Sequence, residues 1–173
     1  AADYSQIELR VLAMLSGDPV LKKIFKAGKD IHTAVAARVF NVAEEAVTKN
    51  MRRQAKVINF GIIYGMGVNA LRANLGSSRE EAQKFYDNYF AEFKMVKEYF
   101  DMVVQEAYAR GYTETMFGRR RYFPALRSKL PFIRAQAERQ AYNAPLQGTA
   151  ADIVKIATIR IEAALGRAQM LNQ

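Results

Sequence analysis

The sequence predicts a mainly α-helical protein with one short β-hairpin, organised as a single unit of 173 residues. Helix caps and helix-ending glycines recur along the chain, and the aromatic residues between positions 85 and 100 repeat at helical spacing, as is typical of a core. The pattern changes to strand-like alternation only near residues 112–123. Half of the residues are hydrophobic, so the chain can bury a sizeable core.

The first half of the chain reads as a series of capped helices. The expected helices are residues 5–15, 20–27, 30–40 and 48–64, followed by a shorter helix that ends near residue 76. Residues 5–8 have the Ser-x-x-Glu spacing of a capping box. Asp18, which precedes a proline, and Asp30 are expected caps of the next two helices, while Thr48 and Asn50 are both plausible caps of the fourth.

The second half combines longer helices with the hairpin. The expected elements are helices 78–93 and 95–110, strands 112–116 and 120–123, and helices 132–142 and 146–165. Ser78 and Glu81 form a second capping-box pattern, and Gly111 ends the helix before the hairpin. Residues 117–119 are the expected turn, and Pro145 is expected to interrupt the last helical segment because proline lacks a backbone N–H.

The composition excludes several classes of site. The chain has no cysteine and one histidine, so disulfides, thiolate metal sites and histidine-rich metal sites are excluded, and any metal would be bound by oxygen. No uninterrupted apolar run is long enough to span a bilayer, and no signal-peptide pattern opens the chain. We therefore expect a soluble cytoplasmic protein without a membrane partner.

The positive charge is large and clustered. The formal net charge is +9, and between Arg110 and Arg139 the sequence has eight Lys and Arg residues against two Glu. A clustered basic segment is typical of a protein that binds a polyanion, most often nucleic acid. Charge alone leaves an acidic protein or an anionic membrane open, although no basic amphipathic helix with a Trp or Phe face supports the membrane.

Four residues at intervals of four form the most informative pattern: Arg52, Lys56, Phe60 and Tyr64, followed by Gly65. Successive members of such a set drift by about 40° on a helix, so they form one stripe with cations near the helix N-terminus and aromatic rings at the other end. Phosphates bind well near helix N-termini, and a sugar and base could lie on the rings. The alternative is a solvated basic edge whose rings face the core.

Four ordered segments resemble the family A DNA polymerases, the DNA polymerase I type, over essentially the whole chain. Residues 3–10, Asp-Tyr-Ser-Gln-Ile-Glu-Leu-Arg, are similar to motif A, and the stripe with its glycine is similar to motif B. Residues 115–121 resemble the Thr-x-x-Gly-Arg-Arg segment, and residues 138–149 resemble the primer-template helix. The resemblance implies a helical fingers subdomain with the hairpin and partial palm elements, part of an α+β polymerase.

The resemblance assigns the stripe to the incoming deoxynucleoside triphosphate. It implies that Arg52 and Lys56 contact the phosphates, with Lys56 also a candidate proton donor to the departing pyrophosphate. His32 matches a position near the same phosphates, although a lone histidine on a helix could instead be structural.

The resemblance also assigns the sugar and base contacts. Phe60 would pack on the sugar, where phenylalanine disfavours dideoxynucleotides, and Tyr64 would lie near the nascent base pair. Glu8 resembles the steric gate that occupies the space of a ribose 2′-hydroxyl.

The resemblance places primer-template DNA on the second half of the chain. Arg139, Asn143 and Gln147 would contact the primer terminus and the minor groove, whose acceptors allow pair shape to be checked without reading sequence. Arg119, Arg120 and the adjacent arginine at 121 would bind the phosphate backbone or form interior ion pairs.

Asp3 is the candidate catalytic metal ligand, although alone it could be an ordinary exposed carboxylate. The resemblance implies two Mg²⁺ ions held mainly by two aspartates, and the second belongs to a His-Asp-Glu motif that this sequence does not contain. We therefore expect a fragment that is inactive alone and needs the remaining palm and thumb of a parent chain. Residues 1–16 would be palm, 17–130 fingers and 131–173 returning palm helices.

Two alternatives remain open at this point. One is a non-catalytic basic helical module that binds nucleic acid without nucleotide selectivity. The other is a natural short protein that completes its site with another chain.

Overall fold

The computed structural model describes residues 4–171, with side chains to residue 166, and confirms the mainly α-helical prediction. In order the elements are α1 (Ile7–Leu15), α2 (Pro19–Lys26), α3 (Ile31–Val39), η1 (Glu44–Ala46), α4 (Lys49–Ile63), α5 (Val68–Leu75), α6 (Arg79–Glu92), α7 (Lys94–Arg110), β1 (Tyr112–Glu114), β2 (Arg120–Tyr122), η2 (Pro124–Arg127) and α8 (Pro131–Leu171). The two short 3-10 helices were not predicted, and both are single turns that need little sequence signal.

Side-chain caps start α2, α3, α4 and α6 where the sequence predicts them. Asp18 accepts hydrogen bonds from the first turn of α2, and Asp30 accepts one from the backbone N–H of Thr33 at 2.8 Å. Ser78 and Glu81 form the complete capping box of α6. These caps satisfy N–H groups that have no partner inside the helix, so each helix begins at a defined residue.

The capping box predicted at residues 5–8 is wrong. The N-cap of α1 is Gln6, whose φ of 55° lies in the left-handed region, and no side chain caps the helix. Glu8 instead accepts a hydrogen bond from the Tyr64 hydroxyl. A contact with a residue far along the chain has replaced the local cap.

One main hydrophobic core joins all eight α-helices, from α1 to α8. Its largest fully buried side chains are Leu9, Leu12, Leu21, Ile31, Ile58, Ile63, Leu71, Tyr89, Phe93 and Leu146. The burial of Tyr89 and Phe93 confirms that the aromatic repeat of α6 serves the core. A smaller cluster beneath the hairpin contains Ala107, Phe123, Leu126, Ala137, Ala141 and Ala144.

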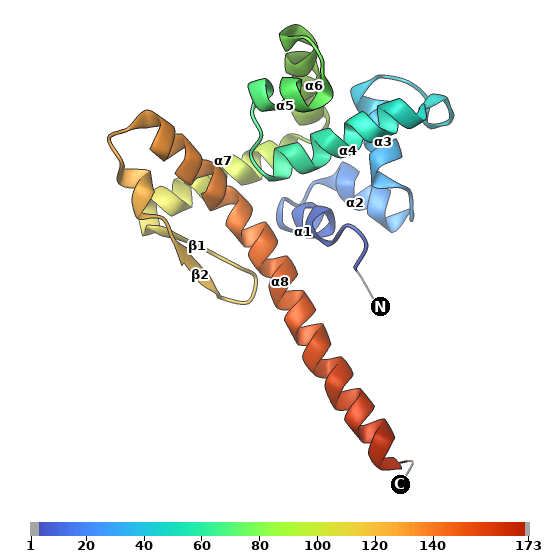
Figure 1. The fold of residues 1–173 in the computed structure, drawn as a ribbon, viewed down its shortest axis with the longest axis vertical. Helices are drawn as coiled ribbons and strands as arrows, with labels where there is room; N and C mark the ends of the chain where they lie inside the picture. Colours follow the sequence, from blue (N-terminus) through green and yellow to red (C-terminus); the bar gives the residue numbers. More distant parts are fainter. Residues whose placement is uncertain (1–3, 172–173) are drawn as a thin grey trace.

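The predicted interruption at Pro145 is also wrong, because α8 runs without a break from Pro131 to Leu171. A proline inside a helix costs about 3 kcal/mol through its missing hydrogen bond and ring clash. The residues around it, Ala144 and Leu146, are buried, so packing on both sides holds this stretch helical. The C-terminal part of α8 projects beyond the body of the molecule (Figure 1). Apolar side chains near this end of the helix, such as Ile159 and Leu165, are exposed.

The hairpin is present but shorter than predicted. β1 pairs with β2 antiparallel, with Thr113 opposite Arg121. The residues between the strands leave the ladder because Thr115 and Thr149 accept their backbone N–H groups. The connection between strands therefore depends on α8.

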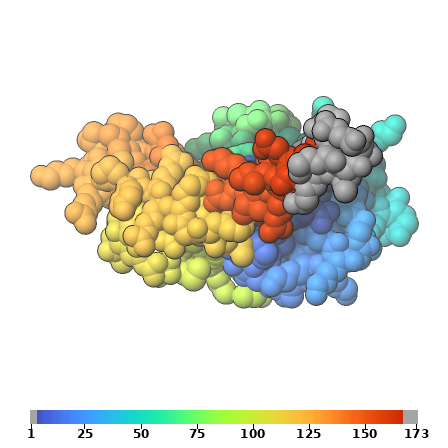
Figure 2. Space-filling model, turned by 90° about the horizontal axis from the view of Figure 1, so that it is seen from below, coloured from blue at the N-terminus to red at the C-terminus, as the bar shows by residue number. Residues whose placement is uncertain are grey.

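The position of α4 determines where the stripe lies. Its first residues are at the periphery beside α3, and its last residues are at the centre beside α8 (Figure 1). Figure 2, a view from below, shows α2 and α3 at one end of the molecule and the segment after the hairpin at the other. None of the helices in residues 4–171 combines the length and apolarity needed to cross a membrane.

Candidate nucleotide and nucleic-acid interface

The predicted stripe lies on an open face of α4. Thr48 is the N-cap, accepting from the N–H of Met51 at 3.2 Å, which places Arg52 in the first turn and Lys56 in the second. Both cations are exposed, and Tyr64 is 48 % exposed. The alternative in which both rings face the core is therefore wrong for Tyr64.

Arg52 is already paired with a carboxylate. Its Nε and Nη2 donate to the two carboxylate oxygens of Asp30 at 3.0 and 2.9 Å. Partial burial alone would raise the pKa of Asp30, but the hydrogen bonds from Arg52 and Thr33 outweigh it and hold that pKa well below its usual range. Asp30 thus caps α3 and ties it to the start of α4. Lys56 has no ion-pair partner among the described residues.

His32 lies behind the two cations and is 3 % exposed. Its Nδ1 lies 3.0 Å from Nδ2 of Asn59, and its ring centroid lies 5.8 Å from that of Phe60. Burial is the main cause that lowers the pKa of His32, and Arg52 and Lys56 lower it further. The structure therefore brings the predicted phosphate residues of α3 and α4 together, with a ring that is neutral near pH 7.

The aromatic end of the stripe joins α1 to α4. The half-buried ring of Phe60 stacks on that of Tyr64 with centroids 6.5 Å apart and planes 17° apart. The Tyr64 hydroxyl donates to Oε2 of Glu8 at 2.7 Å. Partial burial and this hydrogen bond raise the pKa of Tyr64 to about 12, so the phenol stays protonated at neutral pH. Glu8, the predicted steric gate, thus contacts Tyr64, which is predicted to lie near the nascent base pair.

The C-terminal end of α4 is fixed against α8. Nδ2 of Asn143 donates to the carbonyl of Ile63 at 2.6 Å, which satisfies one of the carbonyls left open at a helix end. Gly65 follows with φ of 75°, and a Cβ there would lie 2.5 Å from the Tyr142 hydroxyl and 2.8 Å from Arg139. Arg139 is exposed, whereas Asn143 is buried and used internally.

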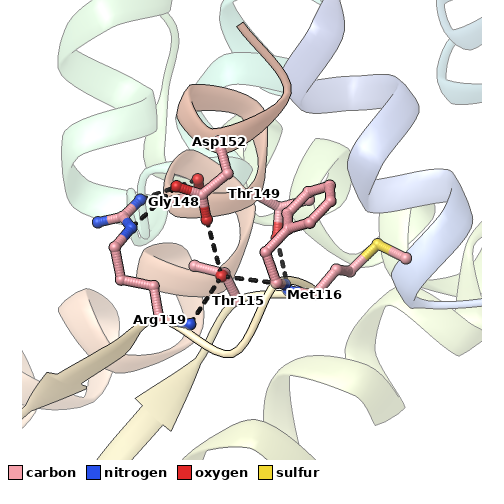
Figure 3. Close-up of polar contacts among 7 residues, drawn as sticks. Thr115, Met116, Arg119, Gly148, Thr149 and Asp152 are labelled. Carbon is pink, nitrogen blue, oxygen red and sulfur yellow. Dashed lines mark hydrogen bonds and ion pairs between the residues drawn. The ribbon is translucent and has the colours of Figure 1, made fainter. Parts of the chain in front are cut away.

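Arg119 is part of a polar network that ties the hairpin to α8 (Figure 3). Its Nε lies 2.9 Å from Oδ1 of Asp152, and its Nη2 donates to the carbonyl of Gly148 at 2.9 Å. Thr115 donates to Oδ2 of Asp152 at 2.8 Å and accepts the N–H of Arg119. Burial would raise the pKa of Asp152, but the hydrogen bonds from Thr115 and Arg119 lower it. The network uses Nε and Nη2 of Arg119, while the side chain as a whole stays 51% exposed.

The arginines of the hairpin and Gln147 line one cleft. Arg120 and Gln147 are exposed, and with Arg119 and Arg121 they border a cavity of about 250 Å³ between the hairpin and α8. Arg120 is paired with Glu114 at 2.8 Å on the surface, where solvent competes for the pair. Of the predicted set, Arg119, Arg120, Gln147 and Arg139 are exposed, and only Asn143 is buried.

Sequence reasoning missed four structural partners. Asp30 was read only as a cap, and Asn59, Thr115 and Asp152 were given no role in the site. Asn59 lies three residues after Lys56, which places it near the same helix face, and Asp152 lies four residues after Gly148. These spacings were the available signals.

The predicted metal ligand, Asp3, lies outside the described residues. Within residues 4–171 no group of three or more His, Cys, Asp or Glu side chains is placed to hold a metal ion. Mg²⁺ is commonly bound by one or two carboxylates together with substrate phosphates, so Asp3 stays a prediction.

Comparison with known protein families identifies the family of this chain. Residues 1–173 match the sequence description of DNA polymerase family A. The chain belongs to this family. The resemblance of the four motifs is therefore confirmed at the level of the family.

Several family A relatives are similar over nearly the whole chain. The chain is 51% identical over 161 residues to the thermostable DNA polymerase I of Thermus filiformis, covering 93% of this chain and 19% of the relative. It is 52% identical over 165 residues to DNA polymerase I of Geobacillus stearothermophilus, covering 95% of this chain and 19% of the relative. The chain thus spans about one fifth of these curated relatives.

A solved family A structure has the same fold. It is the POL domain of Pol1 from M. smegmatis in complex with DNA primer-template and dNTP, at 44% identity and a TM-score of 0.92. The match covers 96% of this chain and 30% of that chain. The predicted fold class, helical with one hairpin as part of a polymerase domain, is confirmed.

Proposed function

We propose that this chain is the part of a DNA-templated DNA polymerase that binds the incoming deoxynucleoside triphosphate and the primer-template. The observation that carries the proposal is the continuous face of α4, in which exposed Arg52 and Lys56 lead to the stacked rings of Phe60 and Tyr64. The M. smegmatis polymerase named above is in complex with DNA primer-template and dNTP, which supports the proposal for both ligands.

The proposed reaction is attack of the primer 3′-hydroxyl on the α-phosphate, with release of pyrophosphate. Phosphoryl transfer is accelerated mainly by positioning and neutralisation of charge. Lys56, which has no carboxylate partner among the described residues, would contact the phosphates and donate a proton to the leaving pyrophosphate. Arg52 would exchange its exposed partner Asp30 for a phosphate.

Glu8 and the aromatic residues would select the sugar. Phe60 would contact the deoxyribose, and Glu8, fixed by the Tyr64 hydroxyl, would occupy the space of a 2′-hydroxyl. A ribonucleotide would press a polar group against Glu8 and disrupt this bond, which costs binding free energy.

The primer-template would lie along the second half of the chain. Arg120 and Arg139 would contact phosphates or the primer terminus, and Gln147 would reach the minor groove. In this arrangement Arg119 and Asn143 act mainly by fixing the hairpin and the end of α4 against α8.

In the parent enzyme this chain would contribute to two subdomains. Residues 1–16 and 131–173 would belong to the palm and residues 17–130 to the fingers, with the rest of the palm and the thumb supplied by the parent chain. Two Mg²⁺ ions, for which Asp3 is one predicted ligand, would neutralise charge on the reacting phosphates when bound.

The nucleotide-binding proposal can be tested by calorimetry with the 173-residue protein and a deoxynucleoside triphosphate. The double variant Arg52→Ala/Lys56→Ala should weaken binding by about tenfold or more, because two charge-assisted contacts are lost. The control, Lys49→Ala/Arg53→Ala, removes the same charge from the same helix but not from the stripe. Equal weakening by both variants would support a basic helix that binds polyanions without nucleotide selectivity.

The expected inactivity of the short chain has its own test. The purified 173-residue protein, given primed template, Mg²⁺ and labelled deoxynucleotide, should incorporate no label, because only one of the two expected aspartates is in its sequence. Incorporation above the level of a protein-free control would refute this prediction.

A further inference from the structure

Asn59 is a buried polar residue on α4 for which the proposed reaction has no role. It is 0 % exposed, and its Nδ2 lies 3.0 Å from Nδ1 of His32. Its Oδ1 is buried and has no hydrogen-bond partner among the described residues. Buried polar atoms are nearly always paired, so an amide kept here with one oxygen unpaired requires an explanation.

The contact between the two side chains restricts the protonation of His32. In the structure the amide nitrogen of Asn59 faces Nδ1 of His32. An amide nitrogen can only donate, so in this orientation Nδ1 is the acceptor and a neutral ring carries its proton on Nε2. The reverse orientation of the amide would turn Oδ1 toward Nδ1, and a neutral ring would then carry its proton on Nδ1. The tautomer of His32 therefore distinguishes the two orientations.

The charges around the ring favour the neutral form. Asp30 at the start of α3 faces it, as do Arg52 and Lys56 on α4, and among the described residues α2 and α6 place no charged group against it. Two cations and burial outweigh one carboxylate that is itself bonded to Arg52. A third positive charge here would be unfavourable before an anion binds.

We propose that Asn59 is a positioning residue that holds Nδ1 of His32 as an acceptor and so presents Nε2–H as a neutral donor to the phosphates of the nucleotide. The contact of the imidazole with Phe60 places the ring on the side of the stripe. Nε2 has no protein partner among the described residues, which leaves it for a ligand. This inference rests on the proposed function of the stripe.

The chain is well suited to a direct test because His32 is its only histidine. In the ¹⁵N-labelled 173-residue protein without nucleotide, one imidazole gives the only histidine ring signals. We expect Nδ1 to show the shift of an unprotonated nitrogen and Nε2 that of a protonated one throughout the neutral form. A neutral ring with its proton on Nδ1 would overturn the proposal.

Two variants separate positioning from packing. Asn59→Asp supplies an acceptor, so it should move the proton to Nδ1 and raise the pKa of His32 by about one unit or more. Asn59→Leu fills similar space without an acceptor and should leave the pKa closer to that of the unchanged protein. Equal pKa values in the two variants, each shown to be folded by thermal unfolding, would indicate a purely structural role. If Asn59→Asp does not fold, the tautomer of His32 in the unchanged protein decides whether the proposal holds.

Inorganic tripolyphosphate distinguishes this inference from the proposed function. At a pH at which the ring is neutral in both proteins, titration should shift the Nε2 signal of the unchanged protein, and Asn59→Asp should lose most of that shift because its neutral ring has no proton on Nε2. Tripolyphosphate that binds while the neutral ring carries its proton on Nδ1 would overturn the role of Asn59 alone. The expected tautomer without any response to tripolyphosphate would overturn the phosphate site and leave Asn59 as a residue that fixes the tautomer.

Discussion

The stripe on α4 and the junction between the hairpin and α8 both contain an arginine predicted to meet phosphate, and they hold it differently. Arg52 has a single carboxylate partner, and the side chains of the pair are 47% and 36% exposed. The side chain of Arg119 is 51% exposed, but it bonds both Asp152 and the carbonyl of Gly148, and Asp152 is only 11% exposed and also bonds Thr115. An exposed pair is worth about 0–1 kcal/mol and can be exchanged for a ligand. The network at the junction is structural.

The largest effect is expected for Lys56, on the stripe. In the polymerase that contains this chain, Lys56→Ala should reduce the rate of nucleotide incorporation by about 10²–10³-fold, the usual effect of removing one transition-state charge contact. Affinity for primer-template should change much less. Single-turnover incorporation and DNA titration measure the two quantities, with Lys49→Ala as the control on the same helix. Equal losses in rate and DNA affinity would argue against the phosphate role.

The next largest effect is expected where the stripe ends against α8. Gly65→Ala should reduce the free energy of unfolding by about 2–4 kcal/mol, because it combines a positive φ with a clash against Tyr142 and Arg139. Gly76→Ala is the control, since Gly76 also has a positive φ of 64° but no atom within 4 Å of its added Cβ. Denaturant unfolding measures both. Similar losses for the two variants would show that the approach of α8 is not tight.

Thr115→Val tests whether the junction is structural. It keeps the shape of the side chain but leaves Oδ2 of Asp152 and the N–H groups of Phe117 and Arg119 without this partner, so we expect a loss of about 1–3 kcal/mol in unfolding free energy. Thr158→Val on the projecting part of α8 removes only an exposed bond to the carbonyl of Val154 and should stay within about 0.5 kcal/mol. Nucleotide affinity should be unchanged in both variants. A selective loss of that affinity in Thr115→Val would show that the junction takes part in nucleotide binding.

The smallest effect is expected for the exposed pair of the stripe. Asp30→Asn keeps a helix cap but loses the ion pair with Arg52, so unfolding free energy at pH 7 should fall by less than about 1 kcal/mol. Asp30→Ala should lose about 1 kcal/mol more, because the cap is also removed.

The pH dependence of this pair has a defined sign. The pKa of Asp30 is lowered in the folded state, so its contribution is full above the usual carboxylate pKa of about 4 and is lost as pH falls below it. Urea unfolding from pH 7 to pH 3 should therefore show the difference between the unchanged protein and Asp30→Asn shrinking. A difference that grows on acidification would contradict the ion pair.

Much of the secondary structure was readable because its causes are local. The caps at Asp18, Asp30 and Ser78 and the spacing of the stripe on α4 depend on neighbours within a few residues. The predictions failed where distant contacts compete. Tyr64 draws Glu8 out of its expected capping box, and packing carries α8 through Pro145.

The sequence by itself determined the family, the helical class and the alignment of two cations and two rings on one face of α4, because helix periodicity and ordered motifs need no partner. Only the tertiary structure decided which of these groups are free to bind a ligand. Arg52 pairs with Asp30, Arg119 pairs with Asp152, and Asn143 bonds the last turn of α4. Lys56 has no ion-pair partner among the described residues. The reason is physical: a charge or amide is satisfied by whichever partner folding brings within hydrogen-bond reach, and those partners lie far away in sequence.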